Sequence, residues 1–349
     1  MNSSKYIGFT FDSDDLDLLF HKIREYHEVL GPKKGDLIKF ELLESAEELD
    51  LTYTQTIFPP KTALLPMREK ILSFVDDNII CVTPSTKRTM LFGVHPCDVQ
   101  AILRQDEFFS KDFQDPYYLK RRCQTVILAL NCVEVGENCF CHSFGIGPSI
   151  STGYDLLLTD IGDRYIVEIG SEAGQTILNN LHLKVAKKED FVLKEEKLDE
   201  ARQRFVKSID ISGLVELVRR SKDHDVWTAL ADTGGVGGSY PCLSCGSCSL
   251  VCPTCYCYDV LENFELSLKK GERWRELDSC QILEYSEMAL GSNPKRNRSQ
   301  RIRHWMSCKF GAAAGGLLSA CVGCGRCIMD CPVHIDITIV AKKLRDDLP

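Results

Sequence analysis

Two cysteine runs with the same spacing carry the clearest chemical signal in this chain. The first run is Cys242-x2-Cys245-x2-Cys248-x3-Cys252 followed by Pro253, and the second run is Cys321-x2-Cys324-x2-Cys327-x3-Cys331 followed by Pro332. This spacing is typical of bacterial [4Fe–4S] binding, in which three close cysteines bind one cluster and the fourth binds the cluster of the other run. The pattern predicts two [4Fe–4S] clusters and a role in electron transfer.

Binding across the two runs predicts two ligand sets. Cluster 1 takes Cys242, Cys245, Cys248 and Cys331, and cluster 2 takes Cys321, Cys324, Cys327 and Cys252. Binding within each run is the first alternative. Two structural zinc sites are the second alternative, because C-x2-C pairs also suit tetrahedral Zn²⁺. Zinc has no use for the third close cysteine or for the proline, so the sequence favours clusters.

Cysteine is also the outlier of the composition. The chain has 18 cysteines in 349 residues. Hydrophobic residues make up 44% of the chain and charged residues 26%. A chain of this length predicts two or three domains. The opening residues, MNSSKYIGFTFDSDD, contain neither a basic start nor an apolar segment, so no secretory signal is expected. The cysteines therefore indicate metal binding in the reducing cytoplasm and not disulfides.

The charge balance excludes some functions. A formal net charge of −8 argues against general binding of nucleic acid. No stretch reaches the roughly 18 consecutive apolar residues of a membrane span, and residues 311–324 are the longest candidate. One basic run stands out, comprising Lys295, Arg296, Arg298, Arg301 and Arg303. Such a run predicts a solvated face, with a docking patch for an acidic partner as the alternative.

Before the cysteine runs, strand and helix patterns alternate. Apolar residues at helical spacing from Leu16 to Leu30 predict a first helix, which Ser13 caps and Gly31-Pro32 ends. Strands are predicted for residues 89–94, 125–130 and 165–169. The alternation predicts an α/β domain over residues 1–190, with its sites at strand ends.

After residue 190 the patterns become helical. Residues 191–239 are expected to form a helical linker region that ends in a glycine-rich segment. An insert separates the two cysteine runs, and residues 262–270 and 282–290 of this insert have helical patterns. We therefore expect residues 240–349 to form a mostly α-helical two-cluster ferredoxin domain.

Four further cysteines, Cys97, Cys132, Cys139 and Cys141, share one context in the α/β region. Cys97 and Cys132 follow predicted strands, and a doubly wound sheet brings such strand ends together. Cys97 also begins a helix, where the dipole favours a thiolate. These residues predict a third [4Fe–4S] cluster. The alternatives are zinc, a redox dithiol, or packing as small buried side chains.

The other six cysteines lack such spacing; they are Cys81, Cys123, Cys255, Cys257, Cys280 and Cys308. Free cysteines usually behave as small buried hydrophobic residues. We therefore expect all six to be packing residues. If one thiol is reactive, Cys255 and Cys257 are the candidates, because they directly follow the first run.

A set of motifs together resembles the iron–sulfur subunit of anaerobic sulfite reductase and the β subunit of cytoplasmic sulfhydrogenase, a NiFe hydrogenase and sulfur reductase. The motifs are Phe58-Pro59-Pro60-Lys61, Gly93-Val94-His95-Pro96-Cys97-Asp98, Asn138-Cys139-Phe140-Cys141, Gly145-x-Gly147-Pro148, Cys252-Pro253-Thr254-Cys255-Tyr256-Cys257-Tyr258, Asp278-Ser279-Cys280 and Cys321-Val322-Gly323-Cys324-Gly325-Arg326-Cys327. The likeness runs from about residue 55 to the end. The Cys97, Cys132 and Cys139/Cys141 positions are also similar to the β subunit of coenzyme F420-reducing hydrogenase, which binds a flavin beside a cluster.

The resemblance implies a non-catalytic electron-transfer subunit of an oxidoreductase complex. In such complexes a flavoprotein oxidises NAD(P)H, and the terminal subunit is a siroheme sulfite reductase or a NiFe hydrogenase. This chain has no nucleotide-binding fingerprint and no P-loop, so a flavin is expected mainly on a partner and, as an alternative, in the α/β domain. The second hypothesis for function is reduction of sulfur or polysulfide by this chain itself, at an N-terminal cluster or a reactive cysteine.

Overall fold

The computed structural model describes residues 8–84, 87–179, 181, 183–311 and 320–348, and its chain divides into two units. The N-terminal unit contains Met1–Pro60, Thr86–Ser208 and Val322–Cys324, and the C-terminal unit contains Lys61–Ser85, Ile209–Cys321 and Gly325–Pro349. Most of the apolar stretch 311–324 and the first seven residues lie outside the described residues. Two short segments thus belong to a different unit from their neighbours in the sequence.

The N-terminal unit is built on a sheet of eight strands in the order β10-β1-β9-β8-β7-β6-β2-β3. The strands are β1 (Gly8–Phe11), β2 (Glu28–Lys33), β3 (Lys39–Leu42), β6 (Thr89–Val94), β7 (Thr125–Leu130), β8 (Leu156–Asp160), β9 (Tyr165–Ile169) and β10 (Lys184–Val185). The central strands β2, β6, β7 and β8 are parallel, and the outer strands are antiparallel. This sheet confirms the α/β prediction for the N-terminal region.

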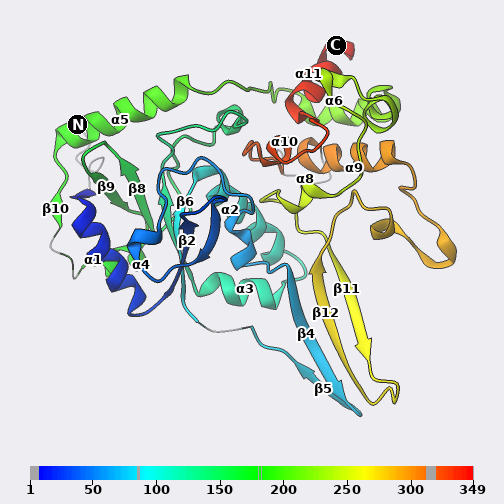
Figure 1. Cartoon of the computed structure of the whole chain (residues 1–349), viewed down its shortest axis with the longest axis horizontal. Coiled ribbons are helices and arrows are strands. Elements are labelled where there is room, and N and C mark those ends of the chain that lie inside the picture. Colours follow the sequence, from blue (N-terminus) through cyan, green and yellow to red (C-terminus); the bar gives the residue numbers. More distant parts are fainter. Residues whose placement is uncertain (1–7, 85–86, 180, 182, 312–319, 349) are drawn as a thin grey trace. The chain divides into compact units, whose positions relative to one another are not determined.

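Helices cover both faces of this sheet (Figure 1). They are α1 (Ser13–Arg24), α2 (Pro96–Ser110), α3 (Pro116–Cys123), α4 (Glu172–Leu178) and α5 (Lys188–Gln203). Helices α1 and α4 pack in one core with alternate residues of the central strands, including Phe92, Leu128 and Leu156. Strands buried on both faces are apolar throughout, as expected of a doubly wound sheet. The carboxyl ends of β6 and β7 lead directly to Cys97 and Cys132.

The first helix differs from the prediction at both ends. It ends at Arg24, and Gly31-Pro32 lies inside strand β2, where Pro32 pairs with Phe40 of β3. Leu30 therefore belongs to a buried strand, whose apolar residues extended the helical spacing by coincidence. Helix α1 begins at Ser13, so Asp12 has the N-cap position: the Asp15 backbone N–H donates to Asp12 Oδ1 at 3.1 Å, and the Asp12 N–H donates to Asp15 Oδ2 at 3.3 Å.

The C-terminal unit combines a sheet with short helices. Its four strands have the order β11-β12-β4-β5, and all pairs are antiparallel. The strands are β4 (Arg68–Val75), β5 (Asn78–Cys81), β11 (Tyr258–Phe264) and β12 (Lys270–Leu277). The helices are α6 (Leu214–Arg220), α7 (Val226–Thr228), α8 (Ser247–Leu250), α9 (Arg298–Phe310), α10 (Arg326–Met329) and α11 (Ile337–Asp347).

The expectation of a mostly α-helical ferredoxin domain needs correction. Residues 262–270 contain the end of β11 and the turn into β12, and residues 282–290 contain only 3-10 turns. Strand β12 pairs with β4, which comes from residues far earlier in the chain. Local spacing cannot reveal such a partner, so tertiary pairing overrode the helical pattern.

The two cysteine runs have the same local backbone. Gly246 and Gly325, at equivalent positions, have φ of 82° and 77° and precede the one-turn helices α8 and α10. Ser244 and Gly323, also equivalent, have φ of 55° and 66°. Left-handed positions bend the chain tightly between successive cysteines. Among the described residues, no helix is both long and apolar enough to cross a membrane.

Candidate metal centres

Three cysteines of the first run line a cavity in the C-terminal unit. Cys242, Cys245 and Cys248 line it together with Cys331 of the second run. Cys327 also lies on its wall, as do the side chains of Ile302 and Trp305. The cavity therefore gathers five cysteines from two runs within a largely apolar wall, and one cubane cluster requires four thiolates.

Electrostatics and hydrogen bonds show how close these thiols lie. Burial, followed by the neighbouring Cys242 and Cys331, raises the pKa of Cys248 well above its usual value. The Ser244 N–H donates to Cys242 Sγ, and the Ile335 N–H donates to Cys331 Sγ, both at 3.3 Å. Backbone N–H donors stabilise thiolate sulfur, and hydrogen bonds to the sulfurs help to set cluster potentials.

Trp305 gives a further indication that this cavity holds a polar group. Its side chain is only 5% exposed, and its indole N–H has no hydrogen-bond partner among the described residues. A buried donor without an acceptor is costly. A sulfur of a bound cluster would supply an acceptor, so the residues that line the cavity fit the cofactor that the cysteine spacing predicts.

The residues of predicted cluster 2 are divided between the two units. Cys252, Cys321 and Cys327 belong to the C-terminal unit, and Cys324 belongs to the N-terminal unit. Cys321 donates its backbone N–H to Lys309 O at 3.0 Å, and Cys327 lies in α10. Cluster 2 therefore stays a prediction from the spacing.

Two buried lysines surround the end of the first run. Lys61 Nζ donates to the carbonyl oxygens of Cys252 at 2.6 Å and Cys255 at 2.7 Å, and Lys309 Nζ donates to Thr254 Oγ1 at 3.0 Å. Burial lowers the pKa of Lys61. Against the effect of burial, the thiols of Cys252 and Cys255 raise the pKa of Lys309. Two buried lysine side chains thus contact this loop, and the raised pKa of Lys309 favours its charged form beside the sulfurs of Cys252 and Cys255.

The four N-terminal cysteines come together in the N-terminal unit. Cys97 is in the first turn of α2 and packs in one apolar cluster with Cys141. Burial, followed by the neighbouring Cys141 and Cys139, raises the pKa of Cys132 well above its usual value. The strand ends therefore bring Cys132 to the loop of Cys139 and Cys141, as the α/β pattern predicted.

Close packing of backbone supports this N-terminal group. Gly147 has φ of 66°, and a Cβ there would lie 2.9 Å from Cys141 Sγ. Gly323 of the second run packs on the same loop: its carbonyl accepts the Phe140 N–H at 2.8 Å, and a Cβ there would lie 2.6 Å from the Cys141 backbone. The carbonyl oxygen of the next residue, Cys324, accepts a hydrogen bond from the side-chain amide of Gln55. A cysteine of the second run therefore lies beside the N-terminal group.

A cavity of about 250 Å³ adjoins this group at the carboxyl edge of the sheet. Cys132 and the neighbouring Asn131 line it. The ring of His95 stacks on that of Tyr53 with centroids 4.0 Å apart, and both rings line the same cavity. Ligands of open α/β sheets bind at this edge.

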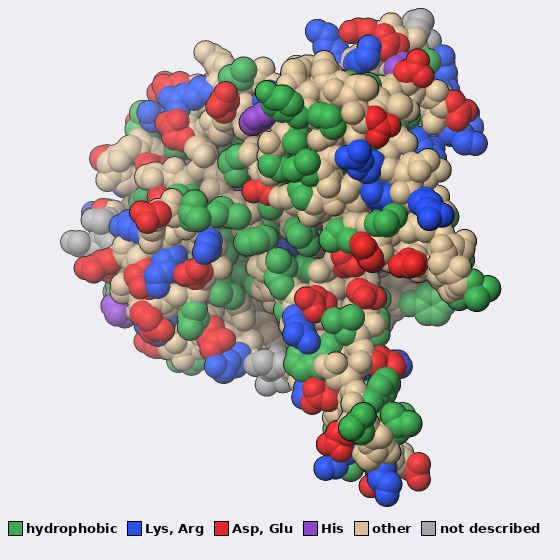
Figure 2. Space-filling model, turned by 45° about the vertical axis from the view of Figure 1, so that its right-hand side comes forward, with side chains coloured by type: hydrophobic (Ala, Val, Ile, Leu, Met, Phe, Trp, Pro, Cys, Tyr) green, Lys and Arg blue, Asp and Glu red, His purple; other side chains and the backbone are tan. Residues whose placement is uncertain are grey.

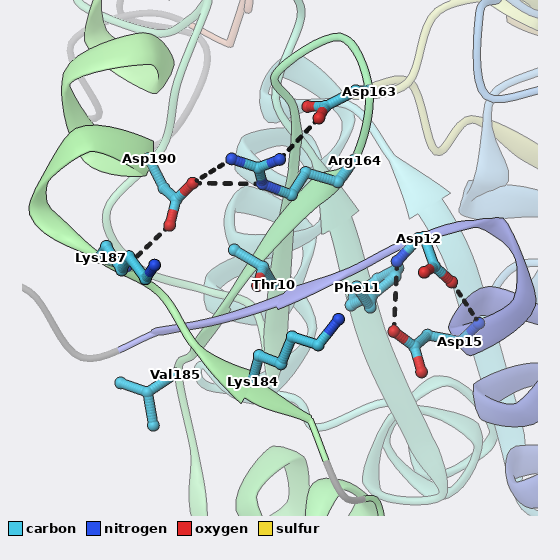
Figure 3. A pocket seen from close by; sticks show the side chains of 10 residues that line it. All are labelled: Thr10, Phe11, Asp12, Asp15, Asp163, Arg164, Lys184, Val185, Lys187 and Asp190. Atoms are coloured by element: carbon cyan, nitrogen blue, oxygen red, sulfur yellow. Dashed lines mark hydrogen bonds and ion pairs between the residues drawn. The ribbon is translucent and has the colours of Figure 1, made fainter.

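A larger cavity of about 370 Å³ lies elsewhere in the N-terminal unit, without cysteine in its lining (Figure 3). Arg164 binds Asp190 at 2.8 Å and Asp163 at 2.6 Å, and the Lys187 N–H donates to Asp190 Oδ2 at 2.7 Å. These charged groups neutralise one another. We therefore assign no chemistry to this cavity.

Several expectations about single residues need correction. Arg301 of the basic run is buried and donates to the carbonyl oxygens of Gln281, Lys295 and Arg296, so it holds the insert and does not form a solvated face. Cys81 and Cys123 are exposed and not core residues. Among the described residues, no group of three or more His, Cys, Asp or Glu is arranged to hold a single metal ion.

Sequence reasoning missed the roles of Lys61, Lys309 and Trp305. Lys61 stands in the Phe58-Pro59-Pro60-Lys61 motif, so the motif was visible but its function was not. Lys309 and Trp305 lie in α9, whose spacing gives no sign that they approach cysteines distant in sequence. Contacts of this kind follow only from the tertiary fold.

Comparison with known proteins agrees with this picture. The 4Fe-4S dicluster domain family matches residues 241–335. Over 334 residues the chain is 32% identical to the sulfhydrogenase 2 subunit beta of Pyrococcus furiosus, an alignment that covers 94% of this chain and 96% of that protein. No solved structure matches it significantly. With this extent of identity, and with the cysteine runs inside the matched domain, the chain belongs to the family of sulfhydrogenase beta subunits.

Proposed function

We propose that this protein is a non-catalytic electron-transfer subunit of an oxidoreductase complex. It relays electrons between a flavoprotein subunit that oxidises NAD(P)H and a terminal reductase or hydrogenase of the sulfite reductase, sulfur reductase or NiFe hydrogenase type. The family and the dicluster domain support this role. The observation that carries the proposal is the cavity lined by Cys242, Cys245, Cys248 and Cys331.

Three [4Fe–4S] clusters are proposed, and their ligands follow from the spacing and from the neighbourhoods described above. Cluster 1 is assigned to Cys242, Cys245, Cys248 and Cys331, cluster 2 to Cys321, Cys324, Cys327 and Cys252, and cluster 3 to Cys97, Cys132, Cys139 and Cys141. When bound, such clusters accept and release single electrons. The protein residues bind the iron through thiolates, donate N–H groups to the sulfurs and exclude water.

The clusters of one chain carry electrons only if a partner delivers them. A flavin splits the two electrons of a hydride into single electrons, and we place this flavin on a separate subunit. The four-stranded sheet of the C-terminal unit extends from its helices as an arm (Figure 1), and Figure 2 shows hydrophobic side chains along this arm. Exposed residues on it include Ile79, Ile80, Phe264, Leu266 and Leu268. Exposed apolar patches of this kind suit a subunit interface.

The proposal is tested with the isolated chain, purified without oxygen and loaded with clusters. Addition of NAD(P)H alone is expected to leave the visible absorption unchanged, whereas addition of the flavoprotein subunit is expected to bleach it. Rapid bleaching by NAD(P)H without flavoprotein would overturn the passive relay and assign oxidation of the nucleotide to this chain. We place the complex in the cytoplasm, because its many free thiols require a reducing compartment.

The second candidate function is reduction of sulfur or polysulfide by this chain. One observation favours it: thiols outside the proposed cluster ligands lie in direct contact with one another in the C-terminal unit. The isolated chain, reduced chemically, distinguishes the two functions. A relay reduces only artificial acceptors, and an enzyme produces hydrogen sulfide from polysulfide without another subunit.

A further inference from the structure

Five cysteines of the C-terminal unit lie outside the twelve proposed cluster ligands; they are Cys81, Cys255, Cys257, Cys280 and Cys308. Two of them, Cys257 and Cys280, form a hydrogen-bonded pair of thiols. Cys257 is partly exposed, whereas Cys280 is only 3% exposed. Thiols in direct contact are too close to bind separate corners of one iron–sulfur cube, so the pair indicates a different chemistry.

The sheet explains why the two thiols meet. Tyr258 of β11 pairs with Leu277 of β12, and the ladder continues with the Asp278 N–H donating to Cys257 O at 3.0 Å. Cys257 and Cys280 therefore stand just outside the same end of a two-stranded ladder. The Cys280 N–H also donates to the sulfur of Cys257. This arrangement holds the two cysteines near each other at the end of the ladder.

The two thiols differ in acidity. The Cys280 thiol donates a hydrogen bond to the sulfur of Cys257, and the Tyr285 hydroxyl is a second donor. Together these hydrogen bonds lower the pKa of Cys257 to about 6. The same hydrogen bond, followed by burial, raises the pKa of Cys280. These hydrogen bonds favour the thiolate form at the partly exposed Cys257 and the protonated form at the buried Cys280. Reactive dithiols divide the roles of nucleophile and resolving thiol in this way.

We propose that Cys257 and Cys280 form a redox-active dithiol that reduces substrates with an S–S bond. The Cys257 thiolate attacks one sulfur of the substrate, forms a mixed disulfide and releases the other half as a thiolate. Cys280 then loses its proton and attacks Cys257 Sγ, which forms the Cys257–Cys280 disulfide and releases the second thiolate. The dithiol loses two electrons and the substrate gains them. Two electrons and two protons from a dithiol reductant reopen the disulfide.

This exchange deepens the second candidate function, reduction of polysulfide by this chain, and does not rest on the proposed electron relay, because neither step uses a cluster. It also differs from a metal site built on the remaining cysteines. Cys308 is electrostatically coupled to Cys257 and Cys280, and its Sγ lies 3.6 Å from His304 Nε2. If the site held metal, Cys308 would act together with the pair, and loss of Cys257 would release iron or zinc.

The experiment uses the full chain with its clusters, purified without oxygen, reduced with dithiothreitol and desalted. Oxidised glutathione and inorganic tetrasulfide serve as probes in separate arms. Mass spectrometry is expected to find a Cys257–Cys280 disulfide, with two molecules of glutathione released per chain in the first arm. A disulfide formed with tetrasulfide alone would restrict the substrate class to sulfane sulfur.

Single substitutions test the separate roles of the two thiols. The Cys280→Ser variant is expected to retain one glutathione on Cys257, because no resolving thiol is left. The Cys257→Ser variant is expected to retain no glutathione at this site. The control variant Cys308→Ser is expected to form the Cys257–Cys280 disulfide as the native chain does. Tyr285→Phe is expected to slow alkylation of Cys257 at pH 6, since it removes one donor to the thiolate. A loss of about four irons in Cys257→Ser, bound zinc, or the absence of the disulfide in both arms would overturn the proposal.

Discussion

Two cysteine-rich regions of the C-terminal unit have opposite arrangements. In the cavity of Cys242, Cys245, Cys248 and Cys331, the thiols lie around a hollow with an apolar wall. In the region from Cys252 to Cys280, thiols hydrogen-bond directly to other thiols, and the buried side chains of Lys61 and Lys309 lie beside them.

The difference shows that cysteine content alone does not define a metal site. A cubane needs thiols separated by the cluster, whereas thiol exchange needs thiols in contact. The polar groups differ accordingly. The cavity has backbone N–H donors and the indole of Trp305, with Arg298 donating to the Cys242 carbonyl at its edge. The other region has two buried lysines. Cys252 stands at the boundary, because the spacing assigns it to a cluster and the structure places its thiol against Cys255.

Loss of Cys331 is expected to have the largest effect. Cys331→Ala removes the fourth thiol from the cavity of the first run, so iron should fall by about four per chain. Electron paramagnetic resonance should show loss of the cluster bound by Cys242, Cys245 and Cys248. Cys123→Ala is the control, since this exposed thiol contacts only Lys120 O and Gln124 among the interactions described. Loss of the other cluster instead would mean that each run binds its own cubane.

The N-terminal group extends the comparison to a third region. Cys132→Ala is expected to lower iron from about twelve to about eight per chain, because this half-buried thiol lies beside Cys139 and Cys141. Iron and acid-labile sulfide should fall together. If the native chain contains only about eight irons, and Cys132→Ala leaves that number unchanged, the N-terminal cysteines serve another purpose.

Sequence spacing predicted the parts of these sites that depend on local backbone. Strands β6 and β7 match the predicted residues 89–94 and 125–130. The equal spacing of the two runs corresponds to equal backbone, with a left-handed position before a short helix in each. A short chain segment determines such features. The carboxyl ends of parallel strands also meet by geometry, which explains why Cys97 and Cys132 could be grouped in advance.

Features that depend on distant partners could not be predicted. Strand β12 pairs with β4, which lies almost 200 residues earlier, so a helical pattern in the insert was misleading. The thiol contact of Cys257 with Cys280 depends on the same sheet. Lys61 approaches Cys252 only because the segment Lys61–Ser85 belongs to the C-terminal unit. No periodicity of a single segment encodes these contacts.

Removal of a buried lysine is expected to have an intermediate effect. Lys61→Met leaves the carbonyl oxygens of Cys252 and Cys255 without this donor, which costs about 2 kcal/mol of unfolding free energy. The apparent melting temperature of the cluster-loaded chain should fall by several degrees. Lys343→Met, which removes an exposed ion pair with Asp347, is the matched control and should change it little. Equal melting temperatures for both variants would mean that the Lys61 contacts contribute nothing.

The smallest expected effect concerns Trp305 and separates the cavity from the thiol pair. Its buried indole N–H has no partner among the described residues, and its side chain lines the cavity. A donor to cluster sulfur binds the reduced, more negative state more strongly, so Trp305→Phe should lower the midpoint potential of that cluster. A difference of about 1 kcal/mol between the two states corresponds to about 40 mV for one electron.

A redox titration followed by electron paramagnetic resonance measures this shift, while formation of the Cys257–Cys280 disulfide should be unchanged. An unchanged potential would mean that the indole does not donate to the cluster, and a shift in a different cluster would reassign the cavity.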